Sequence, residues 1–456
     1  LLSPFSFEEV RKIVFSMKRD KVPGPDGFPA SFYQDFWAIV GPSVWLAVEE
    51  SRVSRNILGN LNHTFICLFP KKSPAEKLDD FRPISLCNTT YKIISKAIAN
   101  RLSPLMHKLV APEQSGFIPG RSITEGIIIS HELIHSLHNS SRAGMLLKLD
   151  FSKAYDRVNW RFLLKSLQAL GFGAHFCKWI FDCIASPRFS VLVNGSAEGF
   201  FQSSRGIRQG DPLSSFLFTI VAEALSRSIK AAILEGSLKG LHISSNLPPL
   251  SHQQFADDTF LFGQGTVPEA RCISSILDSY SVAAGQVLNF HKSVIFFFNV
   301  APRLQGRIKE ILGFSLGKLP HTYLGIPLFH GKGKALLWNG LLNSISAKLL
   351  SWKGKWLSLA GRALLINSVL LSIPIYMLSI LQIPNSVLLK IEKVARTFLW
   401  QGLSTERKFH LANWDLVKLP KKLGGLGILD MAIQNMALGA KLVWNFISDN
   451  SRLAFK

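Results

Sequence analysis

The chain has few acidic residues and few cysteines for its length. Across 456 residues, 52 lysines and arginines outnumber 30 aspartates and glutamates, which gives a formal net charge of +22 at pH 7. An excess of this size is typical of proteins that bind a polyanion, most often nucleic acid, although a merely basic surface is the alternative. The five cysteines include no CxxC pair, so neither a zinc ribbon nor a disulfide framework is supported, and a reducing compartment is favoured.

The sequence also lacks a signal peptide and an initiating methionine, since it begins at Leu1. We therefore expect a fragment of a longer polyprotein, and no targeting signal indicates where it resides. The one apolar stretch long enough to span a membrane is Ala363–Leu381. Asn367 and Pro374 interrupt this stretch, so we expect a buried pair of helices broken at the proline and no membrane segment.

The remaining composition predicts a globular protein. An apolar fraction of 47% argues against disorder, and 456 residues exceed one compact core, so we expect two to four subdomains. Apolar runs predict strands at His63–Phe69, ended by Pro70, and at Met145–Leu149, which turns into a helix near Ser152. A hairpin is predicted around Asn194-Gly195.

Helices are predicted from capping signals and from apolar periodicity. Ser6 followed by Glu9 indicates a capping box. Apolar residues at helical spacing indicate a helix that contains Tyr91, Ile94, Ile98 and Leu102. The sequence "PLSSFLFTIVAEALSRSIKAA" predicts another helix with an apolar face, capped by Asp211 and with Pro212 as its first residue. Strand signals become sparse after Pro320, so we expect a domain boundary near residue 330.

Two acidic positions carry a chemical signal. Asp150 ends an apolar strand, where a carboxylate often only caps the next helix. The sequence "FADDTFLF" places Asp257 and Asp258 at the tip of a predicted hairpin with apolar arms, where like charges repel and are costly to desolvate. If the two strands are neighbours, three carboxylates converge, and a divalent cation relieves their repulsion. Oxygen ligands favour Mg²⁺ or Mn²⁺ over Zn²⁺, and two such ions about 4 Å apart are the machinery of nucleotidyl transfer.

The ordered motifs resemble the reverse transcriptases of LINE-type (non-LTR) retrotransposons, most closely those of plants. The matching runs are "DFRPISLCNTTYKIISKAIANRL", "EQSGFIPGRS", "KLDFSKAYDRVNW", "SRGIRQGDPLSSFLF", "FADDTFLF", "AAGQVLNFHKS" and "YLGIPL". The sequence departs from the family pattern at Ser215, where proline is usual, and in "SITEGIII", which lacks the common Asp-Asn. Either departure is compatible with a decaying copy.

The resemblance implies the fold. We expect an α/β (α+β) right-hand polymerase with fingers, an antiparallel-sheet palm and a helical thumb. An amino-terminal extension and the fingers would occupy 1–140, the palm 141–330, and a basic helical thumb with the start of a connector 331–456. The reverse transcriptase domain overall would cover about 50–330.

The resemblance also implies a catalytic centre that binds two Mg²⁺ ions, with Mn²⁺ as the alternative. Asp150, Asp257 and Asp258 match the catalytic, metal-binding aspartates, with Asp257 the firmer ligand of the pair, and the carbonyl of Phe151 is a further ligand. Tyr155 falls at the aromatic gate that would exclude a 2′-hydroxyl, while a core aromatic is the alternative interpretation.

Other matched positions would bind the nucleotide. Lys71 (or its neighbour Lys72) and Arg82 would hold the triphosphate, although a solvated charge is the alternative for the lysines. Gln209 and Gly210 would lie along the templating base and the incoming nucleotide. Lys292 would lie near the departing pyrophosphate.

The carboxy-terminal part is unusually basic. From Lys332 to Lys422 there are fourteen lysines and arginines but only three acidic residues, so this segment carries half of the net charge. Lys353, Lys355 and Arg362 are candidate contacts to nucleic-acid phosphates. The tryptophans of this segment would either stack on bases or, at helical spacing, anchor a core.

The partners implied by the family are an RNA template, a DNA primer or nicked target DNA, and dNTPs. An endonuclease domain is expected upstream in the full element, and a nuclear location follows from target-primed reverse transcription. Two alternatives stay open: a catalytically inactive nucleic-acid-binding remnant of such an element, and a protein similar to group II intron maturases.

Overall fold

The computed structural model describes residues 1–243, 248–331, 335–350, 357–402 and 408–448. The chain divides into two compact units, each assembled from two stretches. Unit 1 joins Leu1–Ile123 to Arg142–Gly317, and unit 2 joins Thr124–Ser141 to Lys318–Lys456. The assignment of 1–140, 141–330 and 331–456 to fingers, palm and thumb stays a prediction.

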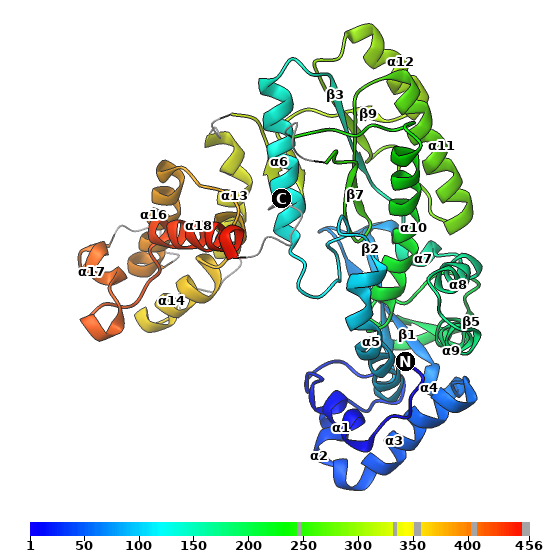
Figure 1. The fold of residues 1–456 in the computed structure, drawn as a ribbon. Coiled ribbons are helices and arrows are strands. Elements are labelled where there is room, and N and C mark those ends of the chain that lie inside the picture. Colours follow the sequence, from blue (N-terminus) through cyan, green and yellow to red (C-terminus); the bar gives the residue numbers. More distant parts are fainter. Residues whose placement is uncertain (244–247, 332–334, 351–356, 403–407, 449–456) are drawn as a thin grey trace. The chain divides into compact units, whose positions relative to one another are not determined.

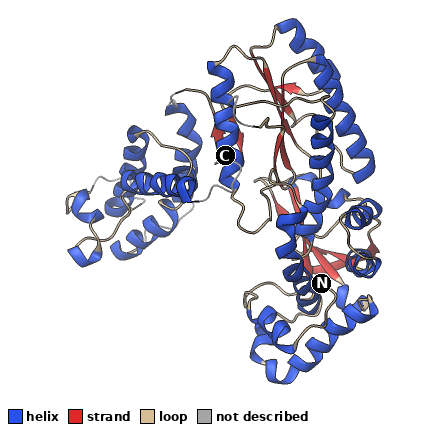
Figure 2. Cartoon of the chain, viewed as in Figure 1, coloured by secondary structure: helices blue, strands red, loops and turns tan. Residues whose placement is uncertain are grey.

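A five-stranded sheet of unit 1 carries the acidic motifs, in the order β6-β7-β3-β8-β9 (Figures 1 and 2). Strand β3 has neighbours on both edges, and five of its six residues are buried, which explains its nearly continuous apolar sequence. The predicted antiparallel pairing is confirmed for every neighbouring pair except β8 and β9, which are parallel. The strands are β3 (Gly144–Leu149), β6 (His252–Phe255), β7 (Asp258–Gly263), β8 (Val294–Phe298) and β9 (Ser315–Leu316).

A second sheet of unit 1 has four strands in the order β2-β1-β4-β5. The predicted hairpin is confirmed, and its turn has φ of 50° at Asn194 and 87° at Gly195. Positive φ at both central residues defines the tight turn that asparagine and glycine favour. The predicted strand at His63–Phe69 is confirmed with slightly shifted bounds. The strands are β1 (Thr64–Pro70), β2 (Phe81–Cys87), β4 (Arg188–Val193) and β5 (Ser196–Gln202).

The helices of unit 1 follow the predicted signals closely. Ser6 caps the first helix, because its hydroxyl accepts the backbone N–H of Glu9 at 3.1 Å. The side chain of Glu9 binds Arg101 instead of completing the capping box. The helices are α1 (Phe7–Phe15), α2 (Ala30–Asp35), α3 (Trp37–Ser54), α4 (Gly59–Asn62), α5 (Thr89–Leu109), α7 (Ala154–Arg157), α8 (Trp160–Ala169), α9 (Ala174–Ala185), α10 (Ser214–Leu234), α11 (Val267–Ala284) and α12 (Pro302–Leu312), with a 3₁₀ turn at Leu78–Asp80.

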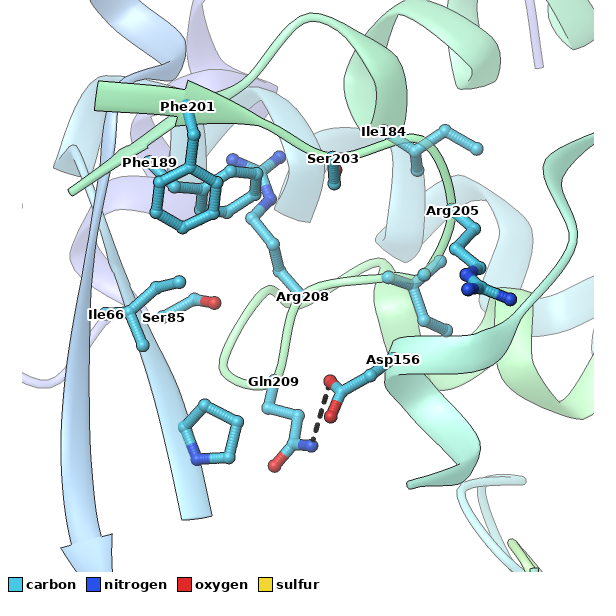
Figure 3. A pocket seen from close by; sticks show the side chains of 13 residues that line it. Ile66, Ser85, Asp156, Ile184, Phe189, Phe201, Ser203, Arg205, Arg208 and Gln209 are labelled. Atoms are coloured by element: carbon cyan, nitrogen blue, oxygen red, sulfur yellow. Dashed lines mark hydrogen bonds between the residues drawn. The ribbon is translucent and has the colours of Figure 1, made fainter. Parts of the chain in front are cut away.

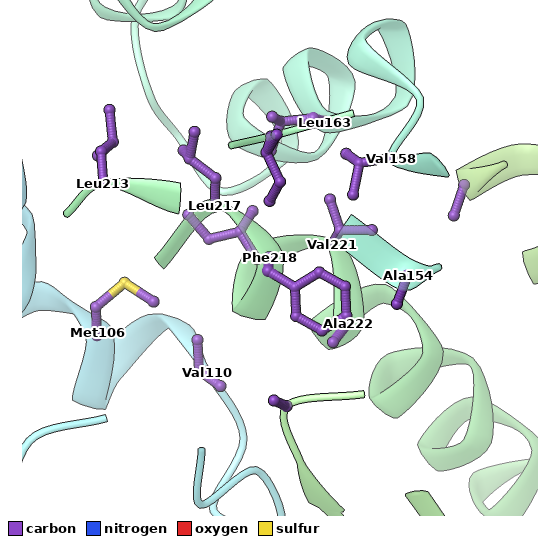
Figure 4. Close-up of a cluster of buried hydrophobic side chains, with 14 of the residues drawn as sticks. Met106, Val110, Ala154, Val158, Leu163, Leu213, Leu217, Phe218, Val221 and Ala222 are labelled. Carbon is purple, nitrogen blue, oxygen red and sulfur yellow. The ribbon is translucent and has the colours of Figure 1, made fainter. Parts of the chain in front are cut away.

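One hydrophobic core joins these helices to the sheet that carries the aspartates. Helix α10 contributes its apolar face to this core, where Leu217, Phe218 and Val221 are buried (Figure 4). The periodic residues of α5 are buried in the same core, as their spacing predicts: Tyr91, Ile94, Ile98 and Leu102. Close packing of this kind gives the neighbouring segments that carry the aspartates a rigid support.

Unit 2 is mainly helical and has its own core. Beyond Leu328, the described residues contain helices and no strand, as expected for the carboxy-terminal part. The elements are α6 (Ile123–Asn139), the hairpin β10 (His321–Tyr323) and β11 (Ile326–Leu328), a 3₁₀ turn (Ala335–Trp338), α13 (Asn339–Leu350), α14 (Leu359–Leu365), a π-helical turn (Ile366–Leu370), α15 (Ile375–Leu378), α16 (Asn385–Gln401), α17 (Trp414–Lys418), a 3₁₀ turn (Lys421–Leu423) and α18 (Met431–Ser448).

The tryptophans of unit 2 act as core anchors where they are described. Trp338, Trp400 and Trp414 are buried in the core of this unit, whereas Trp352 and Trp356 lie outside the described residues. The apolar stretch at 363–381 forms short helices broken before Pro374, which confirms the predicted break. Among the described residues, no helix combines the length and hydrophobicity that a membrane crossing requires.

Candidate active site

Three aspartates lie at one end of the five-stranded sheet of unit 1. Asp150 directly follows β3, and Asp258 begins β7. Strands β3 and β7 pair through Leu149 and Thr259, so the next residues outward along that register are Asp150 and Asp258. The two acidic motifs thus lie on neighbouring strands, which is the condition for the three carboxylates to converge.

The paired aspartates lie on a tight turn between β6 and β7. Phe255 pairs with Asp258, which leaves Ala256 and Asp257 as the two turn residues. Ala256 has φ of 56°, a conformation that residues with a Cβ rarely adopt. The turn leaves Asp257 exposed and Asp258 half-buried, as the predicted hairpin with aspartates at its tip requires.

The three carboxylates interact electrostatically. Surrounding protein atoms desolvate Asp257 even though solvent reaches it, and this raises its pKa; Asp150 adds to the rise and Arg82 opposes it. The pKa of Asp258 rises to about 6, chiefly through desolvation and then through the charge of Asp257, and Lys148 opposes the rise. The ionised forms of Asp257 and Asp258 are thus disfavoured by desolvation and by neighbouring carboxylates.

A divalent cation suits this donor set chemically. Carboxylate oxygens are the ligands that Mg²⁺ and Mn²⁺ prefer, and a cation among them would offset the repulsion that raises the pKa values of Asp257 and Asp258. Within the described part of the chain, no three His, Cys, Asp or Glu side chains are arranged so as to hold a metal ion. Binding an ion would therefore require these aspartate side chains to turn toward one point.

The segment that contains Lys292 is fastened to the end of β3. The backbone N–H of Asn289 donates to the carbonyl of Asp150 at 2.8 Å, and the Ser293 hydroxyl accepts the N–H of Asp150 at 3.1 Å. Buried Phe151 forms a bridge with Leu288 in the same segment. These contacts hold the segment that contains Lys292 beside Asp150 in space, although the two residues are far apart in the sequence.

Tyr155 lies on α7 between the core and the aspartates. Its ring stacks on Phe218 of α10, with centroids 4.8 Å apart and an interplanar angle of 8°. Burial raises the pKa of the Tyr155 hydroxyl, and the charge of Asp257 raises it further. The stacking on Phe218 agrees with a core aromatic, and the role of Tyr155 as the aromatic gate stays a prediction.

Gln209, which precedes Gly210, lines a cavity of about 240 Å³ (Figure 3). The side-chain amide of Gln209 donates to Asp156 Oδ1 at 3.5 Å, and the backbone carbonyl of Gln209 accepts the N–H of Ser85 at 2.8 Å. Gly210 has φ of 115°, and an added Cβ would lie 2.9 Å from the carbonyl oxygen of Ser85. Glycine is required here because the backbone of β2 approaches so closely. The cavity lining is Ile66, Pro83, Ser85, Asp156, Ile184, Phe189, Phe201, Ser203, Arg205, Gly206, Ile207, Arg208 and Gln209.

The expected capping role of Asp211 needs correction. Helix α10 begins at Ser214, and the Asp211 carboxylate accepts the N–H of Leu213 at 3.2 Å, just before the helix. Its other oxygen accepts the Tyr91 hydroxyl at 3.0 Å and lies 3.7 Å from Nη2 of buried Arg208. Asp211 is therefore mainly the counter-ion of Arg208. Apart from the motif that contains both residues, no sequence pattern indicates this pair.

The two predicted triphosphate cations occupy the end of the β1–β2 hairpin. Arg82 of β2 lies opposite Phe69 of β1 in the strand register. Its positive charge lowers the pKa of Asp257, so Arg82 acts electrostatically on the turn that carries the paired aspartates. Exposed Lys71 donates from Nζ to the carbonyl oxygen of Asp79 at 2.9 Å. Neighbouring Lys72 forms an ion pair with Asp80 at 3.0 Å. Of these cations, Arg82 thus has the stronger electrostatic link to the aspartates.

Only one of the three nucleic-acid contacts predicted for the basic tail, Arg362, is among the described residues. Lys353 and Lys355 lie outside the described residues. Arg362 donates from Nη1 to the carbonyl oxygen of Leu399 at 3.2 Å, at the carboxy-terminal end of α16. This guanidinium thus supports a helix end, and its predicted contact with phosphate stays a prediction.

A buried histidine at the base of the aspartate hairpin predicts a pH dependence of stability. His252 lies between the Ser226 and Ser251 hydroxyls, and burial lowers its pKa to about 4, while Glu113 opposes the shift and Lys230 adds to it. The unfolded histidine takes up a proton below about pH 6.5, whereas the folded one stays neutral, so stability falls as the pH decreases from about 6.5 to 4.

We expect His252 to make the native state about 2 kcal/mol less stable at pH 5 than at pH 7.5. Urea unfolding of the wild type and of His252→Gln, which does not titrate, measures this contribution as the difference between their pH dependences. Equal pH dependences of the two proteins would show that His252 does not titrate in this way.

Comparison with known proteins identifies the class and then the family. An antiparallel sheet that presents three aspartates is the arrangement expected for a metal-dependent nucleotidyltransferase. Residues 69–328 match the family described as reverse transcriptase (RNA-dependent DNA polymerase). This match covers more than half of the chain, so the chain belongs to that family, whose members generally use divalent metal ions.

Two of the similar proteins are named after transposable elements. The chain is 29% identical over 439 residues to the transposon TX1 uncharacterized 149 kDa protein of Xenopus laevis, covering 94% of this chain and 32% of that protein. It is 27% identical over 421 residues to the retrovirus-related Pol polyprotein of the type-2 retrotransposable element R2DM of Drosophila melanogaster, covering 89% and 37%. The chain thus spans about a third of the length of these relatives. The LINE-type resemblance is confirmed, while the plant origin stays a prediction.

Among solved structures, a telomerase from Candida albicans in complex with a fragment of telomeric RNA is similar to this chain. The TM-score is 0.40 with 14% sequence identity, and the match covers 93% of this chain and 68% of that one.

Proposed function

We propose that this chain is the RNA-directed DNA polymerase part of a non-LTR retrotransposon protein. It would extend a DNA primer along an RNA template by attack of the primer 3′-hydroxyl on the α-phosphate of a dNTP, with release of pyrophosphate. The observation that carries the proposal is the position of Asp150 and the Asp257–Asp258 turn on paired strands, within a chain of the reverse transcriptase family.

We assign the binding of two Mg²⁺ ions, or Mn²⁺, to Asp150, Asp257 and Asp258, with the Phe151 carbonyl as a further ligand. Bound there, the ions would supply activation of the attacking hydroxyl and stabilisation of the charge on the triphosphate. The raised pKa values of Asp257 and Asp258 support this role, because groups that repel one another gain most from a cation.

The surrounding side chains would orient the substrates. Arg82, whose charge acts on Asp257, suits the triphosphate, with Lys71 beside it. Lys292 would lie by the leaving pyrophosphate. Gln209 and Gly210 would lie along the templating base and the incoming nucleotide.

The remaining expectations concern the full element. The basic tail, with Lys353, Lys355 and Arg362, would bind the template–primer duplex through its phosphates without reading sequence. The primer would be nicked target DNA in the nucleus, cut by an endonuclease domain encoded upstream. The fingers, palm and thumb would follow the 1–140, 141–330 and 331–456 division.

Primer extension tests the proposal. The purified chain is incubated with an RNA template annealed to a labelled DNA primer, four dNTPs and Mg²⁺, and products are resolved by length. We expect template-directed extension that stops when EDTA is added. Salt-dependent binding of the template–primer without any extension would instead identify an inactive remnant, and binding with splicing of an intron RNA would favour a maturase.

Tyr155 is expected to control the choice between dNTPs and rNTPs. Replacing it with valine removes the ring that would clash with a 2′-hydroxyl, so the preference for dNTP over rNTP should fall at least about tenfold, while Tyr155→Phe, which keeps the ring, should retain it. Single-nucleotide incorporation with matched dNTP and rNTP measures this preference. An unchanged preference in Tyr155→Val would leave the tyrosine as a core aromatic only.

A further inference from the structure

The turn that presents the paired aspartates is held by a buried glutamine from a distant segment. Gln114 is fully buried, and its Oε1 accepts the backbone N–H of Ala256 at 2.9 Å. Its Nε2 lies 3.4 Å from the carbonyl oxygen of the same residue, to which it donates. One side-chain amide thus satisfies both backbone polar groups of Ala256, the residue immediately before Asp257.

We propose that Gln114 is a positioning residue that sets the conformation of the Ala256–Asp257 turn and so directs the carboxylates of Asp257 and Asp258. The inference rests on the polymerase function proposed above for these aspartates. Gln114 touches neither carboxylate, and it acts through the backbone of Ala256.

The segment around Gln114 is fixed to the hairpin by its own backbone. Ser115 donates its N–H to the carbonyl of Gln254 at 2.9 Å, and Gln254 donates its N–H to the carbonyl of Glu113 at 2.8 Å. Gln114 and Gln254 form a parallel bridge, so this segment runs beside β6 up to the turn. These backbone hydrogen bonds therefore fix the position from which the Gln114 side chain reaches the turn.

Two further contacts fix the glutamine itself. The Gly116 N–H donates to Gln114 Oε1 at 2.8 Å, which orients the amide so that its oxygen faces the N–H of Ala256. Arg121 donates to the carbonyl of Gln114 at 2.6 Å. Gly116 lies so close to the turn that an added Cβ would be 2.4 Å from the nitrogen of Ala256. Residues 114–116 therefore pack tightly against the turn, and a different turn conformation would disrupt this packing.

The turn needs such support because its conformation is unfavourable for alanine. Ala256 has φ of 56° and is 6% exposed, so its backbone groups have little access to water. A residue with a Cβ in this conformation persists only where its surroundings determine it, and buried backbone groups require partners. Gln114 meets both requirements of Ala256, because it holds the conformation of this residue and hydrogen-bonds its buried backbone groups.

The test compares kcat and KM of the full chain with those of Gln114→Met, which keeps the side-chain length and removes both hydrogen bonds. We expect kcat for dNTP incorporation to fall about 10-fold to 100-fold, with KM for dNTP within about threefold, because misplaced catalytic groups lower the rate more than they weaken binding. The matched control is Gln253→Met, at a neighbouring glutamine of β6 that is 2% exposed. Among the described residues, the Gln253 side chain forms no hydrogen bond with the Ala256–Asp257 turn.

Rescue distinguishes positioning from general stability. If Gln114→Met lowers kcat about a hundredfold, adding Ala256→Gly should raise kcat again by at least about tenfold, because glycine adopts positive φ without strain. A kcat of Gln114→Met within twofold of the wild type, or an equal loss in Gln253→Met, would overturn the proposal. If Gln114→Met does not fold, Gln114→Asn, which shortens the side chain by one methylene, takes its place with the same criteria.

Hydrogen exchange of the turn provides a readout that does not depend on activity. In the folded Gln114→Met protein, a peptide spanning residues 255–258 should exchange at least about tenfold faster than in the wild type, because the Ala256 N–H loses its acceptor. Unchanged exchange would also overturn the proposal. If the wild type shows no polymerase activity but the turn exchanges faster in the variant, the proposed function fails while the structural role of Gln114 stands.

Discussion

Asp257→Asn is expected to reduce template-directed dNTP incorporation by at least about a thousandfold, equivalent to roughly 4 kcal/mol of transition-state stabilisation. Asp257 is exposed at the tip of the β6–β7 turn, and its carboxylate interacts with Asp150 and Arg82. Asparagine preserves the shape of the side chain and removes the charge that would bind a cation. The loss should therefore appear in kcat, with template–primer affinity within about threefold of the wild type.

The matched control is Asp278→Asn, which makes the same exchange at an exposed position of α11. Its activity should equal that of the wild type. Single-turnover extension of a labelled primer measures all three proteins. If Asp257→Asn retains more than about a tenth of the wild-type rate, the assignment of Asp257 as the principal metal ligand is wrong.

Arg208→Met is expected to destabilise the native state by about 3 to 5 kcal/mol, because it leaves the carboxylate of Asp211 buried without a counter-ion. Arg208 is 6% exposed and lies 3.7 Å from Asp211. Its guanidinium also lies 3.9 Å from the ring centroid of Tyr91 and donates to the carbonyl of Cys183 at 2.8 Å. This one side chain thus connects α5, α9 and the loop that carries Gln209.

Denaturant unfolding measures the loss, and two further variants interpret it. Arg205→Met removes an exposed arginine of the same loop and should change stability by less than about 0.5 kcal/mol. Adding Asp211→Asn to Arg208→Met removes the uncompensated charge and should recover part of the stability. A loss below about 1 kcal/mol in Arg208→Met would contradict the interpretation of this pair as a buried ion pair.

Local sequence patterns predicted the elements of the active site well. The apolar run before Asp150 predicted a strand, and β3 begins one residue earlier than expected. Asn194-Gly195 predicted a hairpin because the turn needs positive φ at both residues, and the structure has them. The arms of "FADDTFLF" predicted the hairpin that presents Asp257 and Asp258. In each instance a short-range preference and the global fold agree.

Contacts between distant segments were not predictable from these patterns. Nothing in "EQSGFIPGRS" indicates that Gln114 would bond to Ala256, because the two residues meet only when the hairpin and this segment fold together. Arg208 and Asp211 are close in sequence, but their burial depends on Tyr91 and Cys183 from two other helices. Side-chain partners of this kind depend on tertiary structure, which local preferences do not encode.

The sequence patterns also did not predict that each unit is assembled from two separate stretches of the chain. Residues 124–141 cluster with the carboxy-terminal part, although they lie between the two stretches of unit 1. Amphipathic periodicity predicts that a helix has an apolar face, but it does not identify the surface which that face covers.

Binding of Mn²⁺ to the three aspartates tests the central claim most directly. Electron paramagnetic resonance counts the ions bound to the full chain with an RNA template, a chain-terminated DNA primer and the matching dNTP. The account predicts about two ions per chain in the wild type, and loss of at least one in Asp150→Asn and in Asp257→Asn, with no change in Asp278→Asn. Equal Mn²⁺ binding by all four proteins would show that these aspartates do not form the metal site.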